Sequence, residues 1–375
     1  MATVAVFGMG DIGGAVCRRL AAEPDVTRLW GFDVDRRELD VVAADAAAMA
    51  AYRDRGPEIR VRAVDMQRED QVVGALSMAQ PDVVVHAATL QSWWVLTQLP
   101  SELWRTLEHG ARFGPWLPLH LTLVLKLMRA RAQTGLGFPV VNVAFPDAVN
   151  PVLGCLGLAP TCGAGNSDLL WAGIRAAVAR RAEVPIGSVQ LSLLAHHFHV
   201  LYYWMGLEAV ESLADYPFWL RVLVNGHDVT AELGASALLA EAGRLLPKGR
   251  AIGLRTAESV VKNVLRLVRD DPTPTHTPGP AGLVGGYDVR LRRSGLEVLW
   301  PPGLSPEEAR AINERAQRGD GIERIGPDGS VTFTSEAHRT MKEVLGYDCA
   351  LLTPDDAEAR AEELKARLAA LVQKG

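Results

Sequence analysis

The start of the chain constrains the fold more than any other feature of the sequence. An apolar run at residues 3–7 leads directly into Gly8-Met9-Gly10-Asp11-Ile12-Gly13, and residues 12–22 then have the composition of a helix. Glycines at this spacing permit a tight turn, because no Cβ atom blocks the approach of the backbone to other groups. We therefore predict a buried strand, a glycine turn and a helix at the N-terminus.

Strand-like and helix-like segments alternate after this turn, which is typical of a doubly wound α/β domain with a parallel sheet. The expected strands are residues 28–32, 59–64, 81–86 and 139–144, and the expected helices are residues 39–52, 69–78 and 117–131. The chain becomes rich in proline and glycine at residues 146–165. We therefore predict one domain in residues 1–150 and a second, α+β domain in residues 151–375.

The second domain is expected to begin with a helix and to contain several strands. Its predicted elements are a helix over residues 169–181, a strand over residues 189–204, hairpins over residues 283–300 and 322–333, and an amphipathic helix over residues 354–373. The tryptophan-rich stretch at residues 89–116 has two interpretations. It forms either a mobile loop and helix over a ligand or a helical excursion whose tryptophans simply pack.

Composition excludes several classes of protein. A length of 375 residues with 48% hydrophobic content is enough for two cores. The net charge of −5 and the lack of a dense Lys/Arg cluster argue against a nucleic-acid partner. The four scattered cysteines suggest free thiols in a reducing compartment. The most apolar later run, residues 117–128, is too short to span a membrane, so we expect a cytoplasmic protein with no membrane partner.

The glycine turn has the context of a dinucleotide site. The next predicted strand closes with Asp33, twenty residues beyond Gly13. The helix that follows the turn would present free N–H groups and its positive end to a pyrophosphate. The carboxylate of Asp33 would accept hydrogen bonds from ribose hydroxyls and repel a 2′-phosphate, which favours NAD. Arg36 and Arg37 keep NADP as the less favoured alternative.

Further cofactor contacts are expected at the carboxyl edge of the sheet, where ligands bind in open α/β folds. The fourth strand ends at His86, for which a structural role is the favoured interpretation, and is followed by Ala87-Ala88-Thr89. Asn142, at the end of the fifth strand, would bind nicotinamide or substrate, with loop capping as an equal alternative. The predicted cofactor contacts are Gly8, Met9, Gly10, Asp11, Ile12, Gly13, Asp33, Ala87, Ala88, Thr89 and Asn142.

Three later stretches, in the right order, resemble the lactate/malate dehydrogenase superfamily, which includes the family 4 glycosidases. The first is Val140-Val141-Asn142-Val143-Ala144-Phe145-Pro146-Asp147. The second runs from Gly163-Ala164-Gly165-Asn166-Ser167-Asp168 to Leu194-Ala195-His196-His197-Phe198. The third runs from Gly286-Tyr287-Asp288-Val289-Arg290-Leu291 to Leu304-Ser305-Pro306-Glu307-Glu308. The resemblance covers residues 1–317.

This resemblance implies a Rossmann domain followed by a substrate, catalytic and oligomerisation domain, and a homodimer or homotetramer. It also implies an NAD(P)-dependent dehydrogenase or reductase that transfers a hydride between nicotinamide and a small polar hydroxy or amino substrate. Asp168 would orient the imidazole of His197, which would carry the proton. Apolar helices also suggest an oligomer, although they have a second interpretation, packing within one chain.

The sequence departs from the family pattern where the substrate would bind. The resemblance places a clamping arginine three residues after Asp168, where this chain has Trp171. Phe145 and Phe198 replace the family's asparagine and glycine, so a simple 2-hydroxy acid is in doubt. Arg105 is then the candidate catalytic loop arginine, and the predicted substrate contacts are Asn166, His196 and Arg175.

Two other functions are compatible with the same residues. Ala195-His196-His197-Phe198 also resembles the segment that family 4 glycosidases use with NAD and a divalent metal. On a strand, His197 and His199 would share a face, but Gly165 and Asn166 replace the family's Cys-His pair, so we predict no metal site. The third possibility is a non-catalytic NAD sensor.

Overall fold

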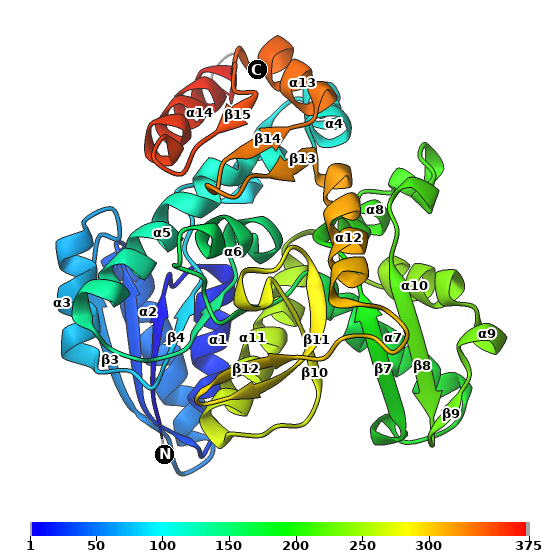
Figure 1. The fold of residues 1–375 in the computed structure, drawn as a ribbon. Helices are drawn as coiled ribbons and strands as arrows, with labels where there is room; N and C mark the ends of the chain where they lie inside the picture. Colours follow the sequence, from blue (N-terminus) through cyan, green and yellow to red (C-terminus); the bar gives the residue numbers. More distant parts are fainter. Residues whose placement is uncertain (1, 373–375) are drawn as a thin grey trace.

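The computed structural model describes residues 2–372 and contains the predicted parallel sheet (Figure 1). Its six strands lie in the order β3-β2-β1-β4-β5-β6, and every neighbouring pair is parallel. They are β1 (Ala2–Phe7), β2 (Val26–Asp33), β3 (Glu58–Ala63), β4 (Val83–His86), β5 (Val140–Asn142) and β6 (Cys162–Gly163). The strand order reverses between β1 and β4, which is where an open α/β sheet leaves a crevice for ligands.

Side chains that alternate along β1 divide the core into two layers. Ala5 and Phe7 belong to the core beneath α3 (Glu69–Ala79) and α5 (Leu117–Thr134). Val4 and Val6 face the opposite way. The helices on that side are α1 (Asp11–Leu20), α2 (Arg36–Ala51) and α11 (Ile252–Arg269). Helix α11 thus covers the N-terminal sheet, although it belongs to the part of the chain that was expected to form the second domain. The domain boundary near residue 150 stays a prediction.

The second half of the chain adds three small antiparallel sheets, two of which lie before residue 300 (Figure 1). One contains β7 (Val189–Leu194), β8 (Trp219–Val224) and β9 (His227–Asp228), and its core includes α7 (Ser167–Arg181) and α10 (Ala235–Arg244). The other contains β10 (Thr275–Pro278), β11 (Gly286–Arg292) and β12 (Gly295–Val298), followed by α12 (Pro306–Ala316). The hairpin expected within residues 283–300 is therefore confirmed.

The single strand predicted over residues 189–204 is wrong in its second half. The strand stops at Leu194, and α8 (His197–Trp204) begins almost at once. The side chain of His196 accepts a hydrogen bond from the N–H of Phe198, and Nδ1 of His199 accepts one from the N–H of His196. Two imidazoles thus satisfy the free donors of the first turn, a capping task usually performed by Ser, Thr, Asp or Asn.

The proline- and glycine-rich segment also contains an element that was not expected. Helix α6 (Pro146–Cys155) begins right after Phe145, whose φ is 44°. Proline is tolerated at the first position of a helix because that N–H has no partner within the helix. This turn brings Asp147 into the first turn of α6, where it is fully buried.

The C-terminal part forms a separate small layer against α5 (Figure 1). It contains β13 (Ile322–Ile325), β14 (Val331–Phe333), α13 (Ser335–Leu345), β15 (Leu351–Leu352) and α14 (Ala357–Val372). The hairpin expected at residues 322–333 is confirmed. The helix predicted over residues 354–373 starts later, at Ala357, and Gln373 lies outside the described residues. Between residues 2 and 372, each helix is too short or too polar to cross a lipid bilayer.

Leu364 of α14 tests whether this C-terminal layer is part of the folding unit. Its side chain is fully buried in the core that also contains α5. Leu364→Ala should lower the free energy of unfolding by about 2–5 kcal/mol, because it removes buried methyl groups and leaves a cavity. Urea denaturation measures this loss. Glu362→Ala, at an exposed position of the same helix, is the control. Equal effects of the two substitutions would contradict the packing.

Candidate functional site

A cleft of about 520 Å³ lies at the carboxyl edge of the parallel sheet, where the strand order reverses. Eight residues predicted to contact a cofactor line it: Gly8, Gly10, Asp11, Ile12, Asp33, Ala87, Ala88 and Thr89. Asn166 and His197, from the second half of the chain, line the same cleft. The structure therefore brings the glycine turn and one imidazole to a single hollow. Contact with a cofactor itself stays a prediction.

Close backbone packing explains the glycines of the turn. Gly8 has a φ of +95°, and a Cβ atom there would lie 2.6 Å from the backbone nitrogen of Ala88. A Cβ atom on Gly13 would overlap the carbonyl oxygen of Gly8. Gly10 is different, because a Cβ atom there would meet nothing within 4 Å. The open space at Gly10, beside the start of α1, is the kind of cradle that lets a phosphate approach backbone N–H groups.

Asp33 closes this turn from the end of β2. Its Oδ2 accepts a hydrogen bond of 2.6 Å from the N–H of Met9, and its Oδ1 accepts one of 2.9 Å from the N–H of Asp35. Met9 contributes this N–H, and its side chain is buried in the core. Neither Met9 nor Gly13 lines the cleft. Arg36 and Arg37 are exposed on α2 and do not line it either.

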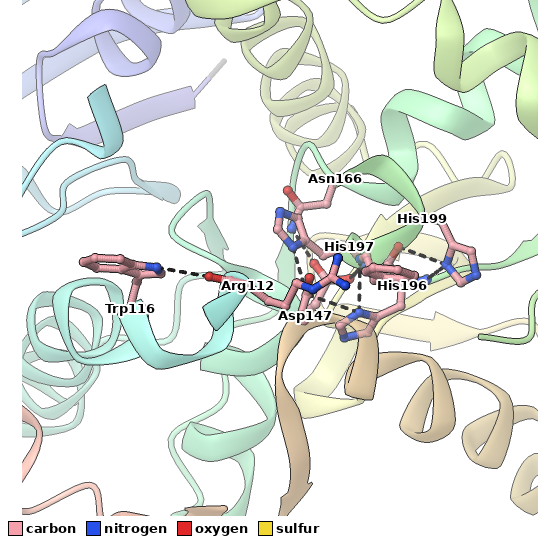
Figure 2. A network of polar contacts seen from close by, with 9 residues as sticks. Arg112, Trp116, Asp147, Asn166, His196, His197 and His199 are labelled. Carbon is pink, nitrogen blue, oxygen red and sulfur yellow. Dashed lines mark hydrogen bonds and ion pairs between the residues drawn. The ribbon is translucent and has the colours of Figure 1, made fainter. Parts of the chain in front are cut away.

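His197 is held by two carboxylates at the start of α8 (Figure 2). Its backbone N–H donates to Oδ1 of Asp147 at 3.0 Å, and its Nδ1 lies 2.9 Å from Oδ2 of Asp320. An ionised carboxylate only accepts hydrogen bonds, so Nδ1 carries the proton and Nε2 remains as the second ring nitrogen. Burial lowers the pKa of His197, but the charge and hydrogen bond of Asp320 and the charge of Asp147 outweigh it and raise that pKa.

The predicted pairing of His197 with Asp168 is wrong. The carboxylate of Asp168 accepts hydrogen bonds from Nζ of Lys262, at 2.6 Å, and from the hydroxyl of Ser259. Both partners lie on α11, so Asp168 ties α7 to α11 and lines a second hollow there. Asp320 takes the expected place beside His197. Asp320 is fully buried and ends the short helical turn that follows α12. It lies beyond residues 1–317, which the sequence resemblance covers.

Asn166 is positioned by the buried carboxylate of Asp147 (Figure 2). Its Nδ2 donates to Oδ2 of Asp147, and this partner fixes the orientation of the amide because a carboxylate cannot donate. Asn166 lines the cleft, as expected of a substrate contact, and its binding to a substrate stays a prediction. Asp147 was not predicted as a site residue. Nothing in the sequence around it signals that it would support both His197 and Asn166.

The other two histidines of this segment are structural (Figure 2). His196 was predicted to contact the substrate, but it is fully buried as a helix cap and does not line the cleft. Nδ1 of His199 accepts from the N–H of His196, and its Nε2 donates to the carbonyl of Tyr216 at 3.1 Å. Burial lowers the pKa of His199 to about 4. The expected shared face of His197 and His199 is wrong, because both lie on a helix.

Three further predicted site residues do not line the cleft. Arg105 is exposed on α4 (Ser101–Thr106) and does not line the cleft. Arg175 donates to the carbonyls of Val189 and Ile186 and stacks on Trp171, so it holds α7 to the start of β7. Asn142 is buried and accepts a hydrogen bond from the N–H of Ala144 at 2.9 Å. Its loop-capping alternative is therefore confirmed, and it also hydrogen-bonds His86.

Aromatic rings form the wall of the cleft around His197. Phe113 and Phe145 have ring centroids 4.7 Å and 5.1 Å from that of His197, and the two rings lie 4.7 Å from each other. Trp93 packs on Phe113 at 4.6 Å. All three line the cleft. The tryptophan-rich stretch thus packs beside the candidate site, as its second interpretation expected. A mobile loop over a ligand stays a prediction.

A serine–histidine–aspartate chain elsewhere in the molecule is structural. Nε2 of His276 lies 2.9 Å from the hydroxyl of Ser167, and its Nδ1 lies 3.1 Å from Asp288. All three residues are buried, and a Cβ atom on Gly286 would overlap the Ser167 hydroxyl. The Gly286 backbone therefore occupies the space that an acyl group would need. These three side chains link α7 to β10 and β11.

Among the described residues, no group of three or more His, Cys, Asp or Glu side chains is arranged to hold a metal ion. The ring nitrogens of His199 are already occupied by backbone groups.

Comparison with solved structures identifies the fold. The sequence matches no family model, and no curated protein is similar enough in sequence to count as a relative. Malate dehydrogenase from Plasmodium falciparum in complex with NADH is similar at a TM-score of 0.55 and 12% identity, over 92% of this chain and 100% of that one. Lactate dehydrogenase from Cryptosporidium parvum, with lactic acid and nicotinamide adenine dinucleotide, is similar at 0.57 and 14%, over 84% and 95%.

Malate dehydrogenase from Picrophilus torridus in its apo form gives a TM-score of 0.57 and 16% identity, over 85% of this chain and 98% of that one. The chain therefore has the fold of the lactate and malate dehydrogenases, as its sequence resemblance implied. At these identities the likeness extends to the fold and not to the residues of the site.

Asp320→Asn tests the electrostatic environment of His197. Removing the buried negative charge that raises the pKa of His197 should lower that pKa. NMR titration of the imidazole signals measures the change. Glu323→Gln, an exposed carboxylate in the same segment, should leave the pKa unchanged. An unaltered His197 pKa in folded Asp320→Asn protein would show that Asp320 does not support the imidazole.

Proposed function

We propose that the chain is an NAD-dependent oxidoreductase, a dehydrogenase or reductase that acts on the hydroxyl or carbonyl group, or the amine, of a small molecule. The observation that carries this proposal is the shared cleft. The glycine turn after β1 and the carboxylate-supported imidazole of His197 line one hollow, although they are far apart in the sequence. The dehydrogenase fold of the chain is consistent with this chemistry.

The residues of the turn fit a dinucleotide. Gly10 leaves open space beside the first N–H groups of α1, which would hold a pyrophosphate. Asp33 would accept hydrogen bonds from the ribose hydroxyls and disfavour a 2′-phosphate, so NAD is proposed and NADP remains the less favoured cofactor. Ala87, Ala88 and Thr89 form the adjoining wall. When bound, NAD supplies the two-electron exchange with the substrate carbon.

His197 would carry the proton. Asp320 binds Nδ1, which leaves Nε2 to exchange a proton with the oxygen or nitrogen of the substrate. Because Asp320 and Asp147 raise the pKa of His197, they favour its protonated form, which would donate to a carbonyl oxygen. In the direction of oxidation, the neutral imidazole would accept the hydroxyl proton. Asp147 would keep the start of α8, and hence the imidazole, in place.

Two finer expectations remain predictions. The homodimer or homotetramer and the cytoplasmic location suggested by the sequence are compatible with the proposed chemistry and are not needed for it.

His197→Asn separates cofactor binding from proton transfer. The variant should bind NADH as the unaltered protein does, because the glycine turn is intact, yet lose about 10²–10⁴-fold in turnover. Quenching of tryptophan fluorescence measures binding, and absorbance at the nicotinamide band measures turnover. His227→Asn, an exposed histidine in β9, is the matched control. Full turnover in His197→Asn would refute the role of the imidazole. NADH binding with no turnover of any alcohol or ketone by the unaltered protein would favour a sensor.

A further inference from the structure

The arginine and lysine side chains that line the cleft are confined to its cofactor end. Among the described residues that line the cleft, Arg250 is the only arginine, and no lysine lines it. Its Nη1 lies 2.9 Å from Oδ2 of Asp11, the first residue of α1, and its guanidinium lies over the ring of Trp94. Arg250 is thus already paired with a carboxylate beside the glycine turn. It does not offer a free guanidinium to a substrate next to His197.

The other arginine close to this region is also engaged. Arg112 forms an ion pair of 2.7 Å with Glu211 through Nη2 and lies over the ring of Phe198. Its Nη1 is buried without a hydrogen-bond partner among the described residues, and Arg112 does not line the cleft. Trp171 occupies the position where the sequence resemblance places a clamping arginine, and it lines the second hollow. A substrate carboxylate beside His197 would therefore find no bidentate cationic partner of the kind that binds such groups.

The wall around His197 is aromatic and uncharged. Phe113 and Phe145 flank the imidazole, and His120 packs on Phe113 with ring centroids 5.1 Å apart. Burial lowers the pKa of His120 to about 3, so this histidine is neutral at physiological pH. Burying an ionised carboxylate against such a wall without a partner is costly, whereas a flat apolar group gains from the same contact.

Asn166 adds a polar group that suits an uncharged hydroxyl. Its amide nitrogen donates one N–H to Asp147, so the amide oxygen and the second N–H are left for a ligand in the cleft. A hydroxyl group can donate to this oxygen or accept from this N–H, whereas a carboxylate oxygen can only accept. A cationic substrate is disfavoured for a different reason. The carboxylates of Asp147 and Asp320 already accept hydrogen bonds from Asn166 and His197, so an ammonium group buried beside His197 would lack an anionic partner of its own.

We propose that the substrate is an uncharged alcohol, or the corresponding ketone, that carries an apolar group of about the size of an aromatic ring. The ring would pack against the wall that Phe113 and Phe145 form, and the hydroxyl would lie between Nε2 of His197 and the amide oxygen of Asn166. This inference rests on the proposed function. Oxidation breaks the carbinol C–H bond, whose two electrons pass with the hydrogen to NAD, and the O–H bond, whose proton passes to Nε2 and then to water.

Three probes that share one benzylic alcohol test the charge preference. They are 1-phenylethanol, mandelate and 2-amino-1-phenylethanol, which carry a neutral, an anionic and a cationic third substituent. Binding to the protein saturated with NADH is measured by calorimetry, and turnover with NAD is measured separately. We expect 1-phenylethanol to bind roughly 10-fold or more tighter than mandelate, because the carboxylate would be buried without a partner. We expect the amine to bind more weakly as well.

Substitutions at Phe113 provide the reciprocal test. Phe113→Arg places a guanidinium in the wall beside His197 and should shift the preference towards mandelate. Phe113→Leu keeps the wall uncharged and should retain the preference for 1-phenylethanol. If Phe113→Arg does not fold, the comparison of the three probes on the unaltered protein still decides the question.

The outcomes separate the two proposals. Protein that binds NADH but prefers mandelate or the amine keeps the proposed function and overturns the substrate class. Protein that fails to bind NADH overturns both. Protein that binds NADH and discriminates against both charged probes supports the uncharged substrate.

Discussion

The site depends on one imidazole held between two buried carboxylates. Asp147 comes from α6, between β5 and β6 of the parallel sheet, His197 from the second half of the chain, and Asp320 from the turn that leads into the C-terminal layer. Buried carboxylates are costly unless they are paired and hydrogen-bonded. Oδ2 of Asp320 accepts its hydrogen bond from Nδ1 of His197, while its Oδ1 has no partner among the described residues. Retaining a proton on His197 is how the fold offsets this buried charge.

The same interaction links stability to chemistry. Nδ1 of His197 donates to Asp320, whose charge favours the protonated imidazole, and the proton that the proposed reaction moves is the one on Nε2 of the same ring. The three parts of the chain must therefore pack correctly for the imidazole to face the glycine turn. The aromatic wall keeps this pair away from water, which strengthens the electrostatic interaction and leaves a small, selective space for a substrate.

Local signals made the N-terminal half predictable. The turn from Gly8 to Gly13 and the acid at Asp33 depend on backbone geometry that a few neighbouring residues determine, and the strands follow from short apolar runs. The site itself depends on contacts between distant segments. Helix α8 begins with two histidine caps instead of the usual capping residues, so its strand-like composition was misleading. Asp320 lies more than a hundred residues from His197, in a Gly-Asp-Gly turn without a recognisable pattern. The dehydrogenase fold is shared with proteins of 12–16% identity, and a shared fold does not determine the substrate.

A crystal structure of the protein soaked with NADH tests the central claim most directly. The account predicts nucleotide density along the glycine turn, with the pyrophosphate beside Gly10, the ribose at Asp33 and the nicotinamide facing Nε2 of His197 across a gap of one small substrate. NADH bound outside this cleft, or a nicotinamide directed away from an imidazole that remains paired with Asp320, would contradict the account.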